Sequence, residues 1–280
     1  MSPLKRVAAV VVPVALVVGG VAYGISRHDS HDDKTVGQCT TKVGRLKVIV
    51  TGTQARNAAL ISGISIRRGM PAHAATIALA TALQESKLYN LRGGDRDSLG
   101  LFQQRPSQGW GTPQQILDPV HATNAFYDAL VRVDGYQTLP VTEAAQEVQR
   151  SGFPSAYAVY ENDARAMASA LTGFSPAAFW CHTPEPSGAP APAVRRAVAV
   201  RRALAPAFGP TEVRVATGSR VQVPVSSRPH GWAVASYLVT RARALGITSV
   251  SYAGRAWDAG DNRGWRAIDS GPDTSVVVVD

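Results

Sequence analysis

One carboxyl group in this chain stands where it could act as a catalytic acid. Residues 72–85 are nearly apolar and are expected to form a buried helix, which places Glu85 at the C-terminal end of that helix. Burial and the negative end of the helix dipole both favour a neutral carboxyl group, so the pKa of Glu85 should rise. An acid that stays protonated near neutral pH can protonate a leaving oxygen. The alternative is a glutamate that caps the helix and faces solvent.

A second motif follows in Asp97-Ser98-Leu99-Gly100-Leu101-Phe102-Gln103-Gln104-Arg105. Together with Gln84-Glu85-Ser86, it resembles the lysozyme-like fold of lytic transglycosylases and goose-type lysozymes, over residues 45–175. In that family a Glu-Ser pair ends a helix, and a Gly-Leu-Met-Gln-type segment comes next. Here the second motif has Phe102 in place of the methionine.

The resemblance implies that Glu85 is the acid and base of glycosidic bond cleavage and that Gln103 shapes the sugar subsites. Lytic transglycosylases need one glutamate because the hydroxyl and N-acetyl groups of the substrate act as internal nucleophiles. An ordinary glycoside hydrolase needs a second carboxylate. Asp95 and Asp97 are the candidates, although their spacing fits a hydrogen-bonded loop equally well, and we favour the loop.

Four further residues are candidates for substrate binding: Ser86, Gln104, Trp110 and Tyr157. Trp110 could stack on a sugar face or anchor its loop in the core. The family's later Ala-Tyr-Asn-type motif is not clearly present, and its nearest matches are Tyr157 and the segment Tyr160-Glu161-Asn162. This departure leaves open a wall-binding domain that has lost its activity.

Apolar periodicity predicts the elements that position these residues. In the first half we expect helices at 53–68 (capped by Thr53), 72–85, 118–133, 141–150 and 155–171, with a long loop at 87–111. In the second half we expect helices at 195–204 and 232–245, and strands at 212–215, 220–225, 249–253, 264–268 and 275–279.

The N-terminus contains a candidate membrane anchor. Residues 7–25 lack charge and are long enough to cross a hydrocarbon core of about 30 Å. Lys5 and Arg6 would keep residues 1–6 in the cytoplasm and send the rest outward. The alternative is a signal peptide cleaved near Gly20-Val21-Ala22. Both interpretations place the remainder of the chain outside the cytoplasm, beyond a polar stalk at 26–38.

The two cysteines agree with that compartment. In an oxidising environment Cys39 and Cys181 could form one disulfide, which would stabilise the fold by roughly 5 kcal/mol in the chain-entropy model. Two unrelated buried thiols are the alternative. A bridge would enclose a domain at 39–182, followed by a linker rich in proline and alanine at 183–193 and a second domain at 194–280.

The second domain contains the segments Gly231-Trp232-Ala233, Ser251-Tyr252-Ala253-Gly254-Arg255-Ala256-Trp257 and Gly264-Trp265-Arg266. With these segments it resembles the D-Ala-D-Ala carboxypeptidase-like zinc fold. That family binds zinc through an upstream histidine and aspartate and a late His-x-His. The matching stretches here, Val215–Gln222 and Ser275–Val279, carry apolar or amide residues at the ligand positions. The resemblance therefore implies a domain without metal, with a binding or structural role, and we expect no cofactor.

Net charge is +9 with a pI near 9.9. Outside a cell this charge favours anionic wall polymers and the membrane surface as partners, and disfavours nucleic acid. The stalk carries a loose cluster of possible metal ligands, namely His28, Asp29, His31, Asp32 and Asp33. A solvated stalk is the favoured interpretation, and a metal-handling membrane component is a minor alternative.

The sequence therefore predicts a mainly α lysozyme-like domain plus a small α+β C-terminal domain, after one N-terminal transmembrane helix. The predicted function is that of a membrane-anchored extracytoplasmic protein that cleaves peptidoglycan glycan strands as a lytic transglycosylase or muramidase. The alternative is a catalytically inactive wall-binding or scaffold protein.

Overall fold

The computed structural model describes residues 37–152, 155–184, 191–216, 218, 220–269 and 274–279. The predicted transmembrane helix and the histidine-aspartate cluster of the stalk lie outside the described residues. Among the helices that are described, none combines the length and the apolar character needed to cross a bilayer.

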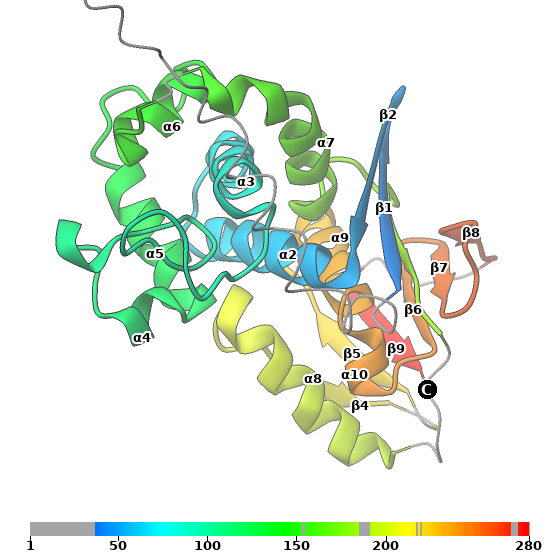
Figure 1. The fold of residues 1–280 in the computed structure, drawn as a ribbon. Coiled ribbons are helices and arrows are strands. Elements are labelled where there is room, and N and C mark those ends of the chain that lie inside the picture. Colours follow the sequence, from blue (N-terminus) through cyan, green and yellow to red (C-terminus); the bar gives the residue numbers. More distant parts are fainter. Residues whose placement is uncertain are drawn as a thin grey trace, which may run out of the picture. The chain divides into compact units, whose positions relative to one another are not determined.

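Helix α3 (Ala72–Ser86) is central to the helical half, where it packs against α2, α5, α6 and α7 (Figure 1). Every residue from 74 to 83 is buried, which explains why the sequence of this helix is apolar on all sides. The surrounding helices are α2 (Gly52–Arg67), α4 (Pro113–Ile116), α5 (Pro119–Leu130), α6 (Val141–Gln149) and α7 (Glu161–Leu171), with short 3₁₀ helices η2 (Pro106–Gln108) and η3 (Ala156–Tyr160).

The start of α2 differs from the prediction. The cap is Thr51, not Thr53: the Thr51 side chain accepts a hydrogen bond from the Gln54 N–H, and the Gln54 side chain accepts one from the Thr51 N–H. This reciprocal pair satisfies two N–H groups that a helix start leaves without partners. It also fixes the direction in which the preceding strand enters the helix.

That strand belongs to a sheet that the sequence analysis did not predict. Strands β1 (Gln38–Val43) and β2 (Leu46–Thr51) form a hairpin through Gly44-Arg45, and β3 (Phe179–His182) pairs with β1, giving the antiparallel order β2-β1-β3. The sheet packs on α7. Gly44 has φ +58°, a conformation that suits glycine in a two-residue hairpin turn.

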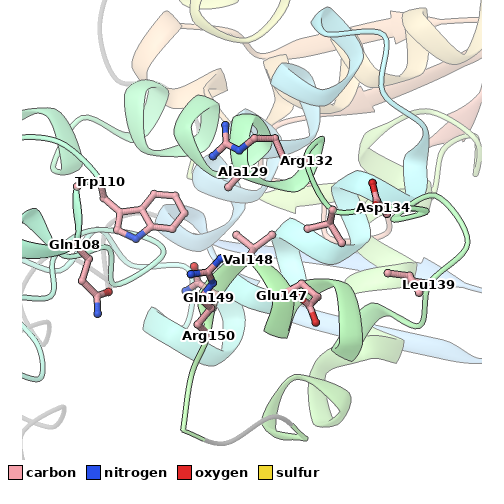
Figure 2. Close-up of a pocket in the computed structure, with 12 residues that line it drawn as sticks. Gln108, Trp110, Ala129, Arg132, Asp134, Leu139, Glu147, Val148, Gln149 and Arg150 are labelled. Carbon is pink, nitrogen blue, oxygen red and sulfur yellow. The ribbon is translucent and has the colours of Figure 1, made fainter.

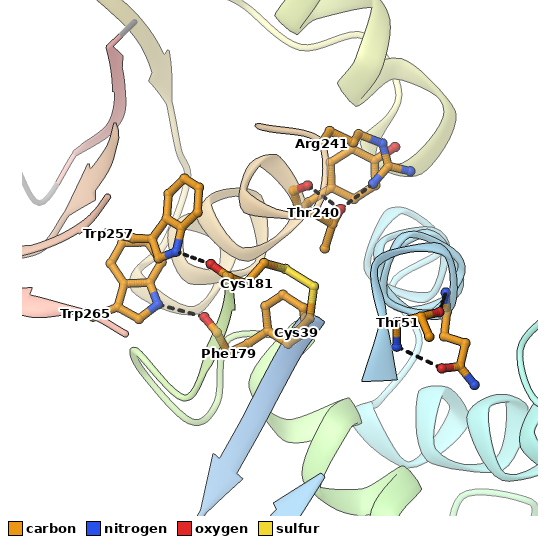
Figure 3. The surroundings of a disulfide bond; sticks show 10 residues. Cys39, Thr51, Phe179, Cys181, Thr240, Arg241, Trp257 and Trp265 are labelled. Carbon is orange, nitrogen blue, oxygen red and sulfur yellow. Dashed lines mark hydrogen bonds between the residues drawn. A yellow bond between two sulfur atoms is a disulfide. The ribbon is translucent and has the colours of Figure 1, made fainter. Parts of the chain in front are cut away.

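The predicted disulfide between Cys39 and Cys181 is confirmed. The two cysteines lie directly opposite each other on β1 and β3, and both are buried (Figure 3). The bridge therefore joins strands that are far apart in sequence but adjacent in the sheet.

The C-terminal half contains a second antiparallel sheet, in the order β4-β5-β9-β6-β7-β8. Its strands are β4 (Arg214–Val215), β5 (Val221–Pro224), β6 (Ser249–Tyr252), β7 (Arg255–Asp258), β8 (Arg266–Ala267) and β9 (Ser275–Val279). Strand β7 was not predicted, and the predicted helix at 232–245 is two helices, α9 (Arg228–Val239) and α10 (Ala242–Leu245), after α8 (Ala193–Phe208).

The two halves share contacts across the predicted linker. Helices α8 and α9 pack against α2, and α9 also packs against α7. Two indole N–H groups of the second half donate to the main chain of β3: Trp257 to the Cys181 carbonyl at 2.8 Å, and Trp265 to the Phe179 carbonyl at 2.7 Å (Figure 3). The described residues of both halves belong to one compact unit.

The predicted fold class is therefore wrong. The described chain contains two antiparallel sheets together with its helices, and none of its described helices could span a membrane. For β3 the error has a physical cause: this strand is only four residues long, and its pairing with β1 depends on the path of the whole helical segment between them. Periodicity within a short window cannot detect such a strand.

Candidate functional site

Glu85 lies in the last turn of α3 and is partly buried. Burial raises the pKa of this carboxyl group above its ordinary value, and this effect outweighs the opposing effects of its neighbours. Those neighbours lower the pKa: the side chains of Tyr157 and Gln149 donate hydrogen bonds, and Lys87 contributes a positive charge. The predicted direction of the shift thus agrees with the structure.

Tyr157 is the direct partner of Glu85. Its hydroxyl donates a hydrogen bond of 2.8 Å to Oε1 of Glu85. The ring is buried in η3, and burial together with the nearby Glu85 charge raises the pKa of the phenol. Because the phenol stays protonated, it remains a donor and fixes the orientation of the carboxyl group.

The chain reverses direction directly after the Glu85-Ser86 pair. Lys87 and Leu88 both adopt the left-handed conformation, with φ of 54° and 63°. The left-handed conformation costs about 1–2 kcal/mol for each residue other than glycine. Two amides of α2 hold the turn in place: Gln54 donates to the Lys87 carbonyl at 2.8 Å, and Asn57 donates to the Leu88 carbonyl at 2.7 Å.

The second motif forms a tight turn that packs against the end of α3. Main-chain hydrogen bonds join Leu99 and Gln104 in both directions. The Ser86 hydroxyl donates to the Leu101 carbonyl at 2.7 Å, which connects the two predicted motifs directly. The Phe102 ring stacks on Phe126 with a centroid distance of 4.6 Å, so the residue that departs from the family pattern is a core anchor.

Gln103 projects from this turn in a left-handed conformation, with φ 47°. Its side-chain amide lies over Gly94, where a Cβ atom would come within 1.7 Å of Oε1. Gln104 is buried, and its amide donates to the Ala122 carbonyl at 3.2 Å. Of the predicted binding residues, Ser86 and Gln104 therefore position the main chain, whereas Gln103 remains partly exposed.

The two candidates for a second carboxylate hold the loop. Asp97 accepts hydrogen bonds from the Ser107 N–H at 2.8 Å and from Nε of Arg105 at 2.6 Å, and both keep the pKa of Asp97 well below its usual range. Asp95 is exposed, and its Oδ2 lies 3.9 Å from Nε of the neighbouring Arg96. This geometry agrees with a hydrogen-bonded loop.

A cavity of about 760 Å³ lies beside this site (Figure 2). Trp110 lines it from the loop before α4, and Val148, Gln149 and Arg150 line it from the end of α6. Gln149 connects the cavity to the acid, because its side chain donates both toward Glu85 and to the Phe102 carbonyl at 2.8 Å. Glu85 does not itself line the cavity, so a ligand there would contact the indole ring and Gln149, the hydrogen-bond partner of Glu85.

No sequence motif points to Gln149, Arg132 or Arg150, nor to the cavity carboxylates Asp134 and Glu147. Arg132 and Asp134 follow α5, and the other three lie at the end of α6, without any motif. The packing of α6 against α3 brings Gln149 within hydrogen-bond reach of Glu85. Lys87 was missed as well: its ammonium group contacts the Tyr160 hydroxyl and lies 4.3 Å from the centroid of that ring. The sequence feature that could have pointed to Lys87 was its position directly after the Glu-Ser pair.

Within the described residues, no group of three or more histidine, cysteine, aspartate or glutamate side chains is arranged to hold a metal ion. Of the stretches singled out in the second half, Val215 lies in β4, Val221 and Gln222 lie in β5, and Ser275–Val279 forms β9.

Comparison with known proteins adds no family assignment to this geometry. No family model matches the chain, and no curated protein matches it in sequence.

Proposed function

We propose that this protein cleaves glycosidic bonds in the glycan strands of peptidoglycan, with Glu85 as the general acid. The observation that carries the proposal is the state of Glu85: a partly buried carboxyl group with a raised pKa, oriented by Tyr157 and joined through Gln149 to a cavity. Protonation of a leaving oxygen near neutral pH requires such a group.

The cavity supports a carbohydrate ligand. Sugar rings present flat C–H faces and many hydroxyl groups. The Trp110 ring offers an aromatic surface for the C–H faces, and the Gln149 amide offers hydrogen bonds to the hydroxyl groups. The disulfide supports a place outside the cytoplasm, where peptidoglycan is found, because such bridges persist in oxidising compartments.

The route of cleavage is part of the proposal. Asp97 is engaged by Arg105 and Ser107, which supports a reaction in which Glu85 is the only essential carboxylate. A lytic transglycosylase of this kind leaves an anhydromuramyl end, whereas a hydrolase leaves a reducing end. Mass spectrometry of the released muropeptides distinguishes the two products.

The test compares the full-length protein with its Glu85→Gln variant on purified sacculi, with release of soluble muropeptides as the readout. We expect the variant to release muropeptides at least about a hundredfold more slowly, because it lacks the general acid. Glu143→Gln is the matched control, since Glu143 is exposed on α6 and does not line the cavity. Equal release by the wild type and Glu85→Gln would refute the catalytic role.

A further inference from the structure

The β1–β2 hairpin combines three cations with two exposed apolar side chains. Lys42, Arg45 and Lys47 lie at or next to its turn and are exposed. Leu46 and Ile49 lie among them on β2, with exposed fractions of 40% and 53%. We call these five residues the basic turn. Figure 1 shows the hairpin at one side of the helical half, where both of its strands pack on α7.

The pleat of the sheet separates the outer face of the hairpin from the core. Every second side chain of the two strands points inward and is buried, namely Cys39, Thr41, Val48 and Val50. On the outer face the register places Lys42 directly opposite Lys47. Like charges in this position destabilise a sheet, and an anion bound beside them would offset the repulsion.

The protein itself does not neutralise these cations. In the part of the chain that the structure describes, none of the three forms an ion pair, whereas Arg68 and Arg214 each hold a carboxylate at 2.6 Å. The sequence gives the reason, because residues 36–84 contain no aspartate or glutamate, and neither do residues 172–182, which include β3. The positive charge of the basic turn is therefore directed at an external anion.

The apolar side chains decide which anion fits. A soluble polyanion, such as a wall polymer, would neutralise the cations but would leave Leu46 and Ile49 in water. The surface of an anionic bilayer offers phosphate groups for the cations and an apolar layer beneath them for aliphatic side chains. The combination of the two kinds of side chain therefore favours a lipid surface.

The place of the hairpin in the chain agrees with this choice. Residues 26–36 separate the predicted anchor from the described part of the chain, and eleven residues can span at most about 40 Å. Strand β1 has six residues, so the hairpin is about 20 Å long. The connection is thus long enough for the turn to point back at the bilayer that holds the anchor.

We propose that the basic turn docks on an anionic phospholipid bilayer, with its three cations at the lipid phosphates and its two apolar side chains in the layer beneath. This inference goes beyond the proposed function and does not depend on it. Strand β2 continues directly into α2, so contact at the turn would fix the orientation of the compact unit relative to the membrane.

Acylation of lysine side chains measures this contact in the full-length protein. The protein is placed in nanodiscs of phosphatidylcholine alone, or of phosphatidylcholine and phosphatidylglycerol in equal parts, and treated with a water-soluble N-hydroxysuccinimide ester. Mass spectrometry then gives the rate at each lysine, with Lys87, which lies after α3 and contacts Tyr160, as the internal reference. Relative to Lys87, we expect Lys42 and Lys47 to react about fivefold more slowly on the anionic nanodiscs, the preference that one basic residue has for such a surface.

The charge of the basic turn is tested by Arg45→Gln, which leaves both reporter lysines in place. Their protection should decrease in this variant, and it should decrease in the wild type at high salt, which screens the attraction. Arg201→Gln is the matched control, because Arg201 is an equally exposed cation on α8. Equal loss of protection in Arg45→Gln and Arg201→Gln would overturn the assignment to this hairpin.

The apolar contribution is tested by the double variant Leu46→Ser, Ile49→Ser, which keeps all three cations. Protection of Lys47 should again decrease. The matched control is Val194→Ser, Val215→Ser, which removes two apolar side chains with exposed fractions of 66% and 48% from α8 and β4. Protection should persist in this control.

Two further results would overturn the proposal. Equal acylation of Lys42 and Lys47 on the two kinds of nanodisc would leave these lysines only the role of keeping an edge strand from pairing with other chains. Protection by soluble poly(glycerol phosphate), without protection by anionic nanodiscs, would identify a wall polymer as the partner. Because the readout requires no cleavage of glycan, the proposal can fail or hold independently of the role of Glu85.

Discussion

The Tyr157 hydroxyl donates a 2.8 Å hydrogen bond to Oε1 of Glu85, across 72 residues of sequence. The tyrosine comes from η3 and the glutamate from the end of α3, and these two elements pack directly on each other. The orientation of the proposed acid thus depends on a 3₁₀ helix that lies far from it in the sequence.

Tyr157→Phe should change both the rate and its pH dependence. Loss of this hydrogen bond removes a contribution that lowers the pKa of Glu85, so that pKa should rise further. Since the acid must be protonated to act, the alkaline limb of the kcat profile should move to higher pH. We expect kcat at its optimum to fall roughly tenfold, because a hydrogen bond to a charged group contributes about 1.5–3 kcal/mol.

Tyr237→Phe is the control for this experiment. Tyr237 is also a buried tyrosine whose hydroxyl donates a hydrogen bond of 2.8 Å, to the Ala203 carbonyl, but it lies in α9, outside the proposed site. Its loss should lower stability without moving the pH profile. An alkaline limb that stays in place in Tyr157→Phe would contradict the role of Tyr157.

Glu85 should reduce the stability of the fold as pH increases. Its pKa is raised in the folded state, so the folded protein binds more protons than the unfolded chain between the unfolded and folded pKa values. Stability is therefore lost as pH rises through that interval, which begins near the ordinary value of 4.5.

The measurement is urea unfolding of the wild type and Glu85→Gln at a series of pH values. At acidic pH the free energy of unfolding of the variant should be similar to that of the wild type. As pH rises above about 4.5, the variant should become the more stable of the two. A stability difference independent of pH would show that burial of the Glu85 charge has no cost.

Gly94→Ala should affect activity more than stability. A Cβ atom at Gly94 would lie 1.7 Å from Oε1 of Gln103, so the Gln103 side chain must move. The moving atoms form the end of a flexible side chain, and the free energy of unfolding should change by less than about 1 kcal/mol. If Gln103 contacts the glycan, kcat/KM should fall on the order of tenfold.

The adjacent Gly93→Ala is a closely matched control, because a Cβ atom there meets nothing within 4 Å. Both substitutions reduce the freedom of the unfolded chain in the same way. Equal kcat/KM values for the two variants would exclude Gln103 from substrate binding.

Reduction of the disulfide should destabilise the protein by about 2–5 kcal/mol, since the bridge closes a long loop. The sequence contains only two cysteines, so a reductant acts on this bond alone. Urea midpoints with and without dithiothreitol measure the effect, and the Cys39→Ser, Cys181→Ser double variant should match the reduced protein. Coincident unfolding curves for the oxidised and reduced protein would contradict a stabilising role.

The parts of the fold that sequence predicts well are those with a local cause. The helices at Ala72–Ser86 and Val141–Gln149 have strong apolar patterns, and their predicted bounds agree with the structure to within one residue. Strand β9 at Ser275–Val279 was predicted with the correct bounds from its run of valines. The Cys39–Cys181 pairing followed from simple counting, because two cysteines allow one bridge.

Only part of the site was predictable, because sequence patterns report local structure and not tertiary contacts. Glu85, Ser86 and Gln103 belong to local motifs, and the structure joins those motifs through the Ser86 hydroxyl and the Leu101 carbonyl. Gln149 has no motif, because its relevance comes from the packing of α6 against α3. Residues that gain a role only through tertiary contacts leave no pattern in a single sequence.

The disulfide also determines how the molecule bears mechanical load. All residues of the proposed site lie between Cys39 and Cys181 along the chain, inside the loop that this covalent bond closes. Tension applied between the two ends of the protein would pass from β1 to β3 through the sulfur atoms and bypass α2 to α7. While the bond is intact, Glu85 and its cavity could keep their geometry in a chain pulled from both ends, and reduction would place the same elements under the full force.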